Sequence, residues 1–167
     1  MKKIIDTKTG GTIFAGIAGE YFVAAELSRR GYIAAITLRN TPKVDILASN
    51  GEKTVNIQVK TRRTDKMNGW NFGGEELKSR QEWSKIFYVL VEISSNPVEK
   101  AVGYYVVPKN ELNERIEKNF QKWISGVNLR NGKPRKSKVR MFKLNEHLDF
   151  LVEKYKDKWD KLFETEK

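Results

Sequence analysis

Residues 54–61 decide the fold of this chain and read Thr-Val-Asn-Ile-Gln-Val-Lys-Thr. Apolar and polar side chains alternate strictly along this stretch, which predicts a β-strand with one apolar and one polar face. The apolar face would carry Val55, Ile57 and Val59, and the polar face Asn56, Gln58 and Lys60. An amide and an amine are therefore expected to stand side by side on the polar face.

A lone acid precedes this strand in what we expect to be a β-hairpin. The first arm would be residues 44–49, Val-Asp-Ile-Leu-Ala-Ser, with Asp45 as its acid. A four-residue loop between the arms would put Asp45 opposite Gln58, whereas a two-residue Asn-Gly turn would put it opposite Asn56. Either register leaves Asp45 on the polar face. The sequence thus gathers an acid, an amide and an amine on one patch of sheet, as a metal-dependent site requires.

Length and composition set the class of protein. The chain has 167 residues, which predicts a single domain, 1–167, that buries about 70% of its unfolded surface. Its core would span about 14–107, followed by a basic loop and a C-terminal helix within 126–167. The absence of cysteine excludes disulfides, thiolate zinc sites and cysteine nucleophiles. The single histidine, His147, argues against mechanisms that need two imidazoles, and we expect it to be a surface or capping residue.

The charge of the chain points to a polyanionic partner. The formal net charge is +11 and the pI is about 9.7. Because phosphate neutralisation releases counterions and supplies much of nucleic-acid affinity, nucleic acid is the expected partner. The alternative is a lysine-rich surface that only keeps the protein in solution. No run approaches the roughly 18 apolar residues of a membrane span, and the first residues lack a signal-peptide core, so we expect no membrane partner and a cytoplasmic location.

Periodicity and turn signals predict the order of the elements. A helix is expected over 14–30, stopped by Gly31, and a second helix over 109–125, opened by Pro108. The other elements would be strands at 32–38, 44–49, 54–60, 83–93, 102–107 and 139–144, a loop entering a short helix at 61–80, a basic loop at 126–138, and a last helix capped by Asn145. This alternation predicts an α/β domain with a mixed sheet.

Asp45 is the best candidate for a metal ligand. A hard cation such as Mg²⁺ takes oxygen ligands, which the Gln58 amide and the Val59 backbone carbonyl would extend. Lys60 would orient the attacking water and steady charge on a phosphate. The alternative for Asp45 and Lys60 is an ordinary cross-strand ion pair.

A second carboxylate, Glu20, is the only acid within 14–25 and lies beside Gly16 and Gly19. Those glycines would let the helix approach the sheet closely and aim Glu20 at the Asp45 patch. The alternative is a surface glutamate. No Gly-Lys-Ser/Thr follows the glycines, so they do not form a phosphate-binding loop.

These motifs together resemble a known family. Gly16-Ile-Ala-Gly-Glu20, Val44-Asp45 and Ile57-Gln-Val-Lys-Thr61 are similar to the PD-(D/E)XK nuclease superfamily, near its Mrr-like and Holliday junction resolvase-like branches with glutamine in the second motif. The resemblance covers about 14–63. It implies a restriction-endonuclease-like α/β/α sandwich with a central mixed sheet, whose αβββαβ core would extend to about 107.

The resemblance also implies roles for four residues. Glu20 would match the helix acid, Asp45 the metal-binding acid, Gln58 the second acidic position and Lys60 the catalytic lysine. Such enzymes hydrolyse nucleic-acid phosphodiesters with Mg²⁺ or Mn²⁺. Two departures stand out: Pro42 does not directly precede Asp45, and Gln58 supplies no charge. They favour a single-metal site or a binding domain without catalysis over a two-metal site.

Basic and aromatic residues around the site predict a nucleic-acid interface. Residues 129–143 contain no acid and would grip the phosphate backbone. The alternative is a solvated loop. The expected nucleic-acid contacts are Arg62, Arg63, Trp70, Arg130, Lys133, Arg135, Lys136, Lys138 and Arg140, with Trp70 stacking on a base and Phe72 more simply anchoring its loop.

We therefore interpret the chain as a metal-dependent endonuclease acting on DNA. One alternative is a non-catalytic nucleic-acid-binding module on the same fold, and another is a basic adaptor for an acidic protein. The C-terminal stripe of Tyr155, Trp159, Leu162 and Phe163 would pack on its own domain by default or mediate a homodimer.

Overall fold

A central five-stranded sheet organises the protein. The computed structural model describes residues 10–38, 44–74, 86–94, 96, 98 and 101–164. The sheet has the order β1-β2-β3-β5-β6, and its strands are β1 (Ile33–Ile36), β2 (Ile46–Ser49), β3 (Thr54–Arg63), β5 (Ile86–Ile93) and β6 (Gly103–Pro108). The predicted turn at 41–42, the short helix near 80 and the start of a strand at 83 lie outside the described residues.

The sheet is mixed, as the sequence predicted. β3 lies at its centre, antiparallel to β2 and parallel to β5, while β5 and β6 are antiparallel. The β2–β3 hairpin pairs Ile46 with Ile57 and Ser49 with Thr54, so a four-residue loop joins the arms. This confirms the four-residue loop and rules out the two-residue turn, and it places Asp45 just beyond the last regular pair of the ladder, Ile46 with Ile57.

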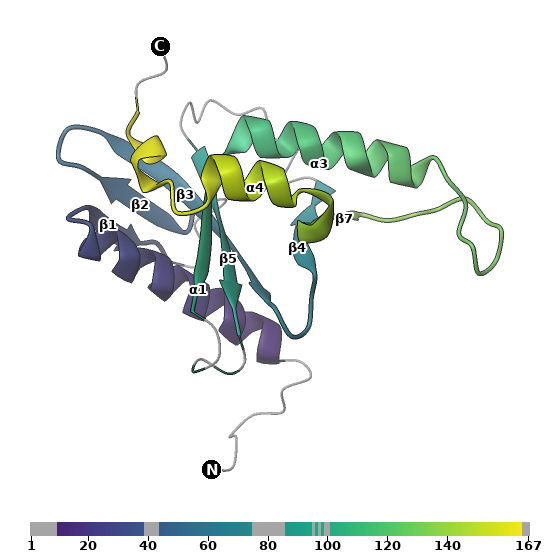
Figure 1. The fold of residues 1–167 in the computed structure, drawn as a ribbon, viewed down its shortest axis with the longest axis horizontal. Coiled ribbons are helices and arrows are strands. Elements are labelled where there is room, and N and C mark those ends of the chain that lie inside the picture. The colour runs from purple at the N-terminus through teal and green to yellow at the C-terminus, as the bar shows by residue number, and fades with distance from the viewer. Residues whose placement is uncertain are drawn as a thin grey trace.

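Two layers cover the sheet (Figure 1). Helix α1 (Gly10–Arg29) packs on one face, where Val23, Leu27 and Ile57 share a buried cluster. The other face carries α3 (Lys109–Ile124), α4 (Leu148–Tyr155) and a two-stranded ribbon of β4 (Gly69–Gly73) and β7 (Val139–Lys143). Trp70, Tyr88 and Leu112 belong to the second buried cluster. The fold is therefore an α/β sandwich with helices on both faces.

Helix α1 begins earlier than predicted and ends as predicted. Gly31 follows it with φ of +83°, the left-handed conformation that glycine adopts without cost. Gly19 meets β3 so closely that an added Cβ would lie 1.8 Å from Thr61 Oγ1, whereas nothing lies within 4 Å of such a Cβ at Gly16. The close approach predicted for the two glycines is confirmed for Gly19 alone.

No helix in the described part of the chain is long and apolar enough to span a bilayer.

The prediction of a loop after β3 is wrong for 61–63 and 69–73, whereas residues 64–68 form no helix or strand, as predicted. β3 continues to Arg63, and residues 69–73 form β4, which pairs antiparallel with β7. The stretch Gly-Trp-Asn-Phe-Gly does alternate, but it is short and its partner lies about 70 residues further along the chain. Tertiary pairing and burial of its two aromatic rings, rather than local preference, make it a strand.

The C-terminal helix is shorter than predicted. α4 ends at Tyr155, Asp157 has a positive φ of 55°, and its N–H donates to the Tyr104 carbonyl at 3.1 Å. The chain then forms a short 3₁₀ turn, η2 (Trp159–Leu162). Asn145 caps nothing, since it lies inside the 3₁₀ turn η1 (Leu144–Glu146).

The apolar stripe of this segment packs on its own domain. Tyr155, Trp159 and Leu162 are each 2% exposed or less. The default interpretation is confirmed for these three side chains, which are not available to a second copy.

Alanine at the two glycines of α1 should have opposite effects. Gly19→Ala should lower the free energy of unfolding by about 1 kcal/mol or more, because the new Cβ would also lie 3.0 Å from Thr61 Cβ, which rotation of that side chain cannot relieve. Gly16→Ala should raise it by up to about 1 kcal/mol through helix propensity. Urea unfolding measures both, and a Gly19→Ala protein as stable as Gly16→Ala would contradict the close packing.

Candidate functional site

Asp45 lies where the β2–β3 ladder stops being regular. The last regular pair is Ile46 with Ile57. The Asp45 N–H donates to the Ile57 carbonyl at 2.9 Å, and its carboxylate Oδ2 accepts the Val59 N–H at 2.7 Å. On the other side, the Asp45 carbonyl accepts the Thr37 N–H at 2.9 Å. Backbone bonds on both sides thus fix the half-buried carboxylate against β3, between the positions of Gln58 and Lys60.

Gln58 directly precedes Val59, whose N–H holds this carboxylate, and it presents a buried amide oxygen. The residue is 9% exposed and pairs with Tyr88 of β5, which is fully buried. Its Oε1 accepts no hydrogen bond from any described residue. A buried amide oxygen without a donor is costly, and nearly all such atoms in proteins find a partner. An oxygen of this kind next to a carboxylate fits a bound cation.

Lys60 lies two residues further along the same face of β3. It is half-buried, and its Nζ lies 5.6 Å from the centre of the Phe72 ring. Phe72 is 1% exposed and belongs to the core, as its anchoring interpretation predicted. Strand alternation places Lys60 on the same face of the sheet as Gln58, and Phe72 lies on that face too.

Glu20 approaches β3 from the opposite layer. It follows Gly19, which contacts Thr61, and Thr61 points to the face that α1 covers. The half-buried Glu20 is therefore level with the end of the site along β3, but α1 and Lys60 lie on different faces of the sheet. Its part in a metal site stays a prediction, as does that of the Val59 carbonyl.

The residues present fit a hard cation held by few protein ligands. Among the described residues, no group of three or more histidine, cysteine, aspartate or glutamate side chains could hold a metal ion. Mg²⁺ keeps several waters and is commonly bound through one or two carboxylates plus substrate phosphate. Asp45 with the Gln58 oxygen matches that donor set, whereas zinc would require more nitrogen or sulfur ligands.

Arg62 and Trp70 are not nucleic-acid contacts, so this prediction is wrong for both. Arg62 is 5% exposed and forms a buried ion pair with Glu92, its partner in the β3–β5 register. Trp70 is 1% exposed, and its Nε1–H donates to the Val91 carbonyl at 3.1 Å. Arg62 lies over the Trp70 ring at 4.9 Å. The ribbon covers this end of β3 and buries both side chains.

Arg140 is also a structural residue. It is 8% exposed, forms an ion pair with Glu117 at 2.5 Å and lies 4.2 Å from the centre of the Phe120 ring. Its predicted phosphate contact is therefore wrong. Arg63, by contrast, stays partly accessible at the end of β3 beside Asp65, 3.3 Å away.

The basic segment forms an arm that extends past the end of α3 (Figure 1). Here "the arm" means residues 126–138, which contain no strand and a single isolated bridge between Val127 and Pro134. Most of its predicted contacts are exposed, and only Arg135 is half-buried. The exposed ones are Arg130, Lys133, Lys136 and Lys138. These four cations face solvent, and their contact with phosphate stays a prediction.

Two residues of consequence were missed from the sequence. Glu92 is the only acid in the buried strand Ile86–Ile93, which was a signal for a buried cationic partner. Trp123, near the end of α3, is 44% exposed. Its position in the sequence, next to the acid-free arm, could have indicated an exposed aromatic residue.

Comparison with known proteins finds similar solved structures, of which two are described here. No protein-family model matches the chain, and no curated protein does. The Holliday junction resolvase Hjc of Archaeoglobus fulgidus is 15% identical, over 91% of this chain and 98% of that chain, with a TM-score of 0.49. The bacterial homing endonuclease I-Ssp6803I is 15% identical, over 60% of this chain and 67% of that chain, with a TM-score of 0.43. TM-scores below 0.5 are too low to support any statement about activity.

Arg62 and Arg63 should separate structure from binding. Arg62→Ala should lower the free energy of unfolding by about 3–5 kcal/mol, because it leaves Glu92 buried and unpaired. Arg63→Ala should change it by less than about 0.5 kcal/mol. Urea unfolding measures both, with Arg62→Met/Glu92→Leu as the control that removes both charges and should recover stability. An Arg62→Ala protein as stable as wild type would show that the pair does not matter.

Proposed function

We propose that this chain is a metal-dependent endonuclease that hydrolyses phosphodiester bonds of DNA. The observation that carries the proposal is the buried Gln58 oxygen without a donor among the described residues, one residue before Val59, whose N–H fixes the Asp45 carboxylate. The basic arm and the net charge of +11 support a polyanionic substrate.

The residues of the site would divide the work. Asp45 would bind the cation through the carboxylate that the backbone already orients, and Gln58 would complete the donor set with its neutral oxygen. Glu20 and the Val59 carbonyl would add further oxygens from the helix side and from β3. A bound Mg²⁺ or Mn²⁺ would supply an activated water and neutralise charge on the phosphate.

Lys60 would act on the substrate. Its ammonium group, held beside Phe72, would donate hydrogen bonds to the attacking water and to a non-bridging phosphate oxygen. Arg63 would hold a neighbouring phosphate at the end of the same strand. Hydrolysis would then follow from positioning and charge stabilisation rather than from a covalent intermediate.

A non-catalytic binding module is the second candidate. The neutral Gln58 and the low number of acids near Asp45 favour it, since they weaken affinity for a metal. It would bind DNA through the arm without cutting. The two candidates differ in metal binding, and that difference can be measured without a cleavage assay.

Asp45→Asn and Lys60→Ala should abolish cleavage and leave the fold intact. Asparagine keeps an oxygen that accepts the Val59 N–H but removes the charge, so cleavage of plasmid, linear, single-stranded and branched DNA in Mg²⁺ or Mn²⁺ should fall about 100-fold or more. Cleavage by Lys60→Ala should fall by a similar factor. The exposed Asp149→Ala and Lys66→Ala serve as controls.

A second readout tests the metal site itself. Mg²⁺ should raise the Tm of the wild type and not that of Asp45→Asn. DNA binding without cleavage and without a Mg²⁺-dependent rise in Tm would support the binding module. Full cleavage by a folded Asp45→Asn protein would remove the proposed site.

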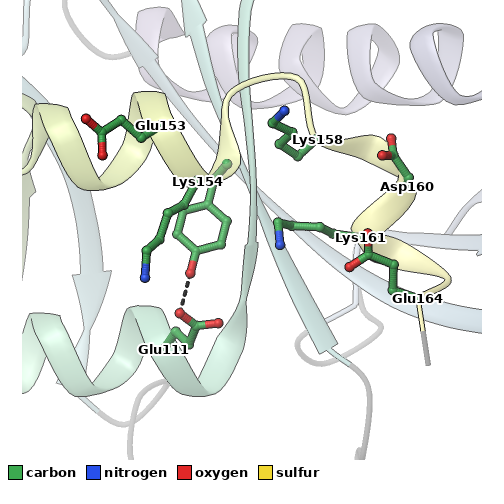
Figure 2. A pocket seen from close by; sticks show the side chains of 8 residues that line it. Glu111, Glu153, Lys154, Lys158, Asp160, Lys161 and Glu164 are labelled. Carbon is green, nitrogen blue, oxygen red and sulfur yellow. Dashed lines mark hydrogen bonds between the residues drawn. The ribbon is translucent and has the colours of Figure 1, made fainter. Parts of the chain in front are cut away.

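The arm should govern salt dependence. Lys136→Ala/Lys138→Ala should reduce the slope of log affinity against log salt by about 1–2 on duplex DNA, because each lost phosphate contact contributes roughly 0.9. The matched control is Lys154→Ala/Lys158→Ala. Those two lysines line a pocket around Tyr155, where they lie among the acids Glu111, Glu153, Asp160 and Glu164 (Figure 2). An unchanged slope in the first variant would show that the arm does not hold phosphates.

A further inference from the structure

A second concave surface lies away from the Asp45 site. It is a groove of about 710 Å³ between the C-terminal half of α3, the outer face of the β4–β7 ribbon and the arm. The residues that matter below are Asn71, Lys122, Trp123, Arg135, Val139 and Met141. A neighbouring hollow of about 530 Å³ shares Phe120, Arg135 and Ser137 with it and is lined by Lys136 and Lys138. We call the two together the arm groove.

The arm groove exposes an aromatic ring that the fold holds in place. Trp123 lies beyond the part of α3 that the sheet covers, since Leu112 and Ile116 are buried and Trp123 is 44% exposed. The Arg135 guanidinium lies 5.1 Å from its ring centre and donates to the Trp123 carbonyl at 2.7 Å. Held in this way, the ring loses little freedom when a ligand stacks on it.

Apolar and amide groups continue the surface. Val139 and Met141 on the outer face of β7 are 51% and 46% exposed, and the exposed Asn71 pairs with Met141 across the ribbon. A flat ring could rest on the apolar side chains while the Asn71 amide donates and accepts hydrogen bonds at its edge. Contiguous exposed apolar groups rimmed by polar residues are typical of binding sites.

The charge of the arm groove indicates an anionic ligand. Residues 127–143 contain no acid, and Lys122, Lys136 and Lys138 border the two hollows. The one acid that lines them, Glu146, is 2.6 Å from Lys143. Burial lowers the pKa of His147, which is therefore neutral at pH 7 and adds no cation. Cations therefore outnumber acids along the arm groove.

The pocket around Tyr155 differs sharply in charge. There, lysines alternate with four carboxylates, and Glu111 accepts the Tyr155 hydroxyl (Figure 2). Phosphates would be repelled from those acids. Charge therefore distinguishes the arm groove from this other described concavity.

We propose that the arm groove binds an unpaired stretch of DNA, with a base stacked on Trp123 and its phosphates on Lys122, Lys136 and Lys138. An acidic peptide would match the cations but would leave the ring, the apolar strip and the Asn71 amide without planar partners. Unpaired nucleotides match all three, because every base offers a flat face and polar edges. The inference rests on the proposed action on DNA and names the single-stranded part of the substrate.

Binding of fluorescein-labelled dT20 and of a 20-bp duplex, both in EDTA, tests the arm groove. Trp123→Ala should weaken dT20 binding at least about fivefold and duplex binding by less than twofold, whereas Trp123→Phe, which keeps a ring, should retain most dT20 affinity. Met141→Glu, on an exposed position, should weaken dT20 binding through charge. Lys122→Ala should reduce the salt slope, and Lys118→Ala, exposed on the same helix, should not.

The outcomes separate this inference from the proposed function. Equal binding of dT20 by wild type, Trp123→Ala and Met141→Glu, with circular dichroism showing all three folded, would contradict the proposal that the arm groove binds unpaired DNA. Competition by poly-glutamate as strong as by unlabelled dT20 would overturn it in favour of an acidic protein. If Trp123→Ala weakens dT20 binding but the wild type shows no metal-dependent cleavage, the arm groove binds unpaired DNA and the proposed endonuclease activity is wrong.

Discussion

The parallel pairing of β3 with β5 is the constraint on which the site depends, and a buried ion pair fixes it. Arg62 and Glu92 face each other in the register with side chains 5% and 7% exposed. The second Glu92 oxygen accepts the Tyr105 hydroxyl at 3.1 Å, and burial raises the pKa of Tyr105 to about 12, so the tyrosine remains a neutral donor. A slip of one residue would bury both charges without partners. The pair therefore also sets Gln58 opposite Tyr88.

The parts of this fold that could be predicted are those encoded locally. Alternation over residues 54–61 predicts β3, the hairpin loop length sets the place of Asp45, and Gly31 ends α1. The ribbon could not be predicted, because β4 becomes a strand only against β7, far along the chain. The end of α4 likewise depends on a hydrogen bond from Asp157 to the remote Tyr104 carbonyl.

The same distinction divides the site residues. Asp45, Gln58 and Lys60 are brought to one region by strand pairing, which the sequence encodes in its alternation and turn. Arg62 has the same alternation, so the sequence alone assigns it to the same polar face. Only the ribbon, which covers the end of β3 with Trp70, makes that position part of the core. Side-chain chemistry predicted which groups could bind phosphate, and tertiary cover decided which remain accessible.

The ribbon also lies between the two proposed binding surfaces. Its inner face carries Phe72, against which Lys60 lies, and its outer face carries Asn71 and Met141, which line the arm groove. The site and the arm groove thus lie on opposite faces of one strand layer, the ribbon. A continuous duplex is too stiff to turn around the edge of such a layer, whereas a strand that leaves a duplex can do so. For the proposed action on DNA, this geometry favours a boundary between paired and unpaired regions over uninterrupted duplex.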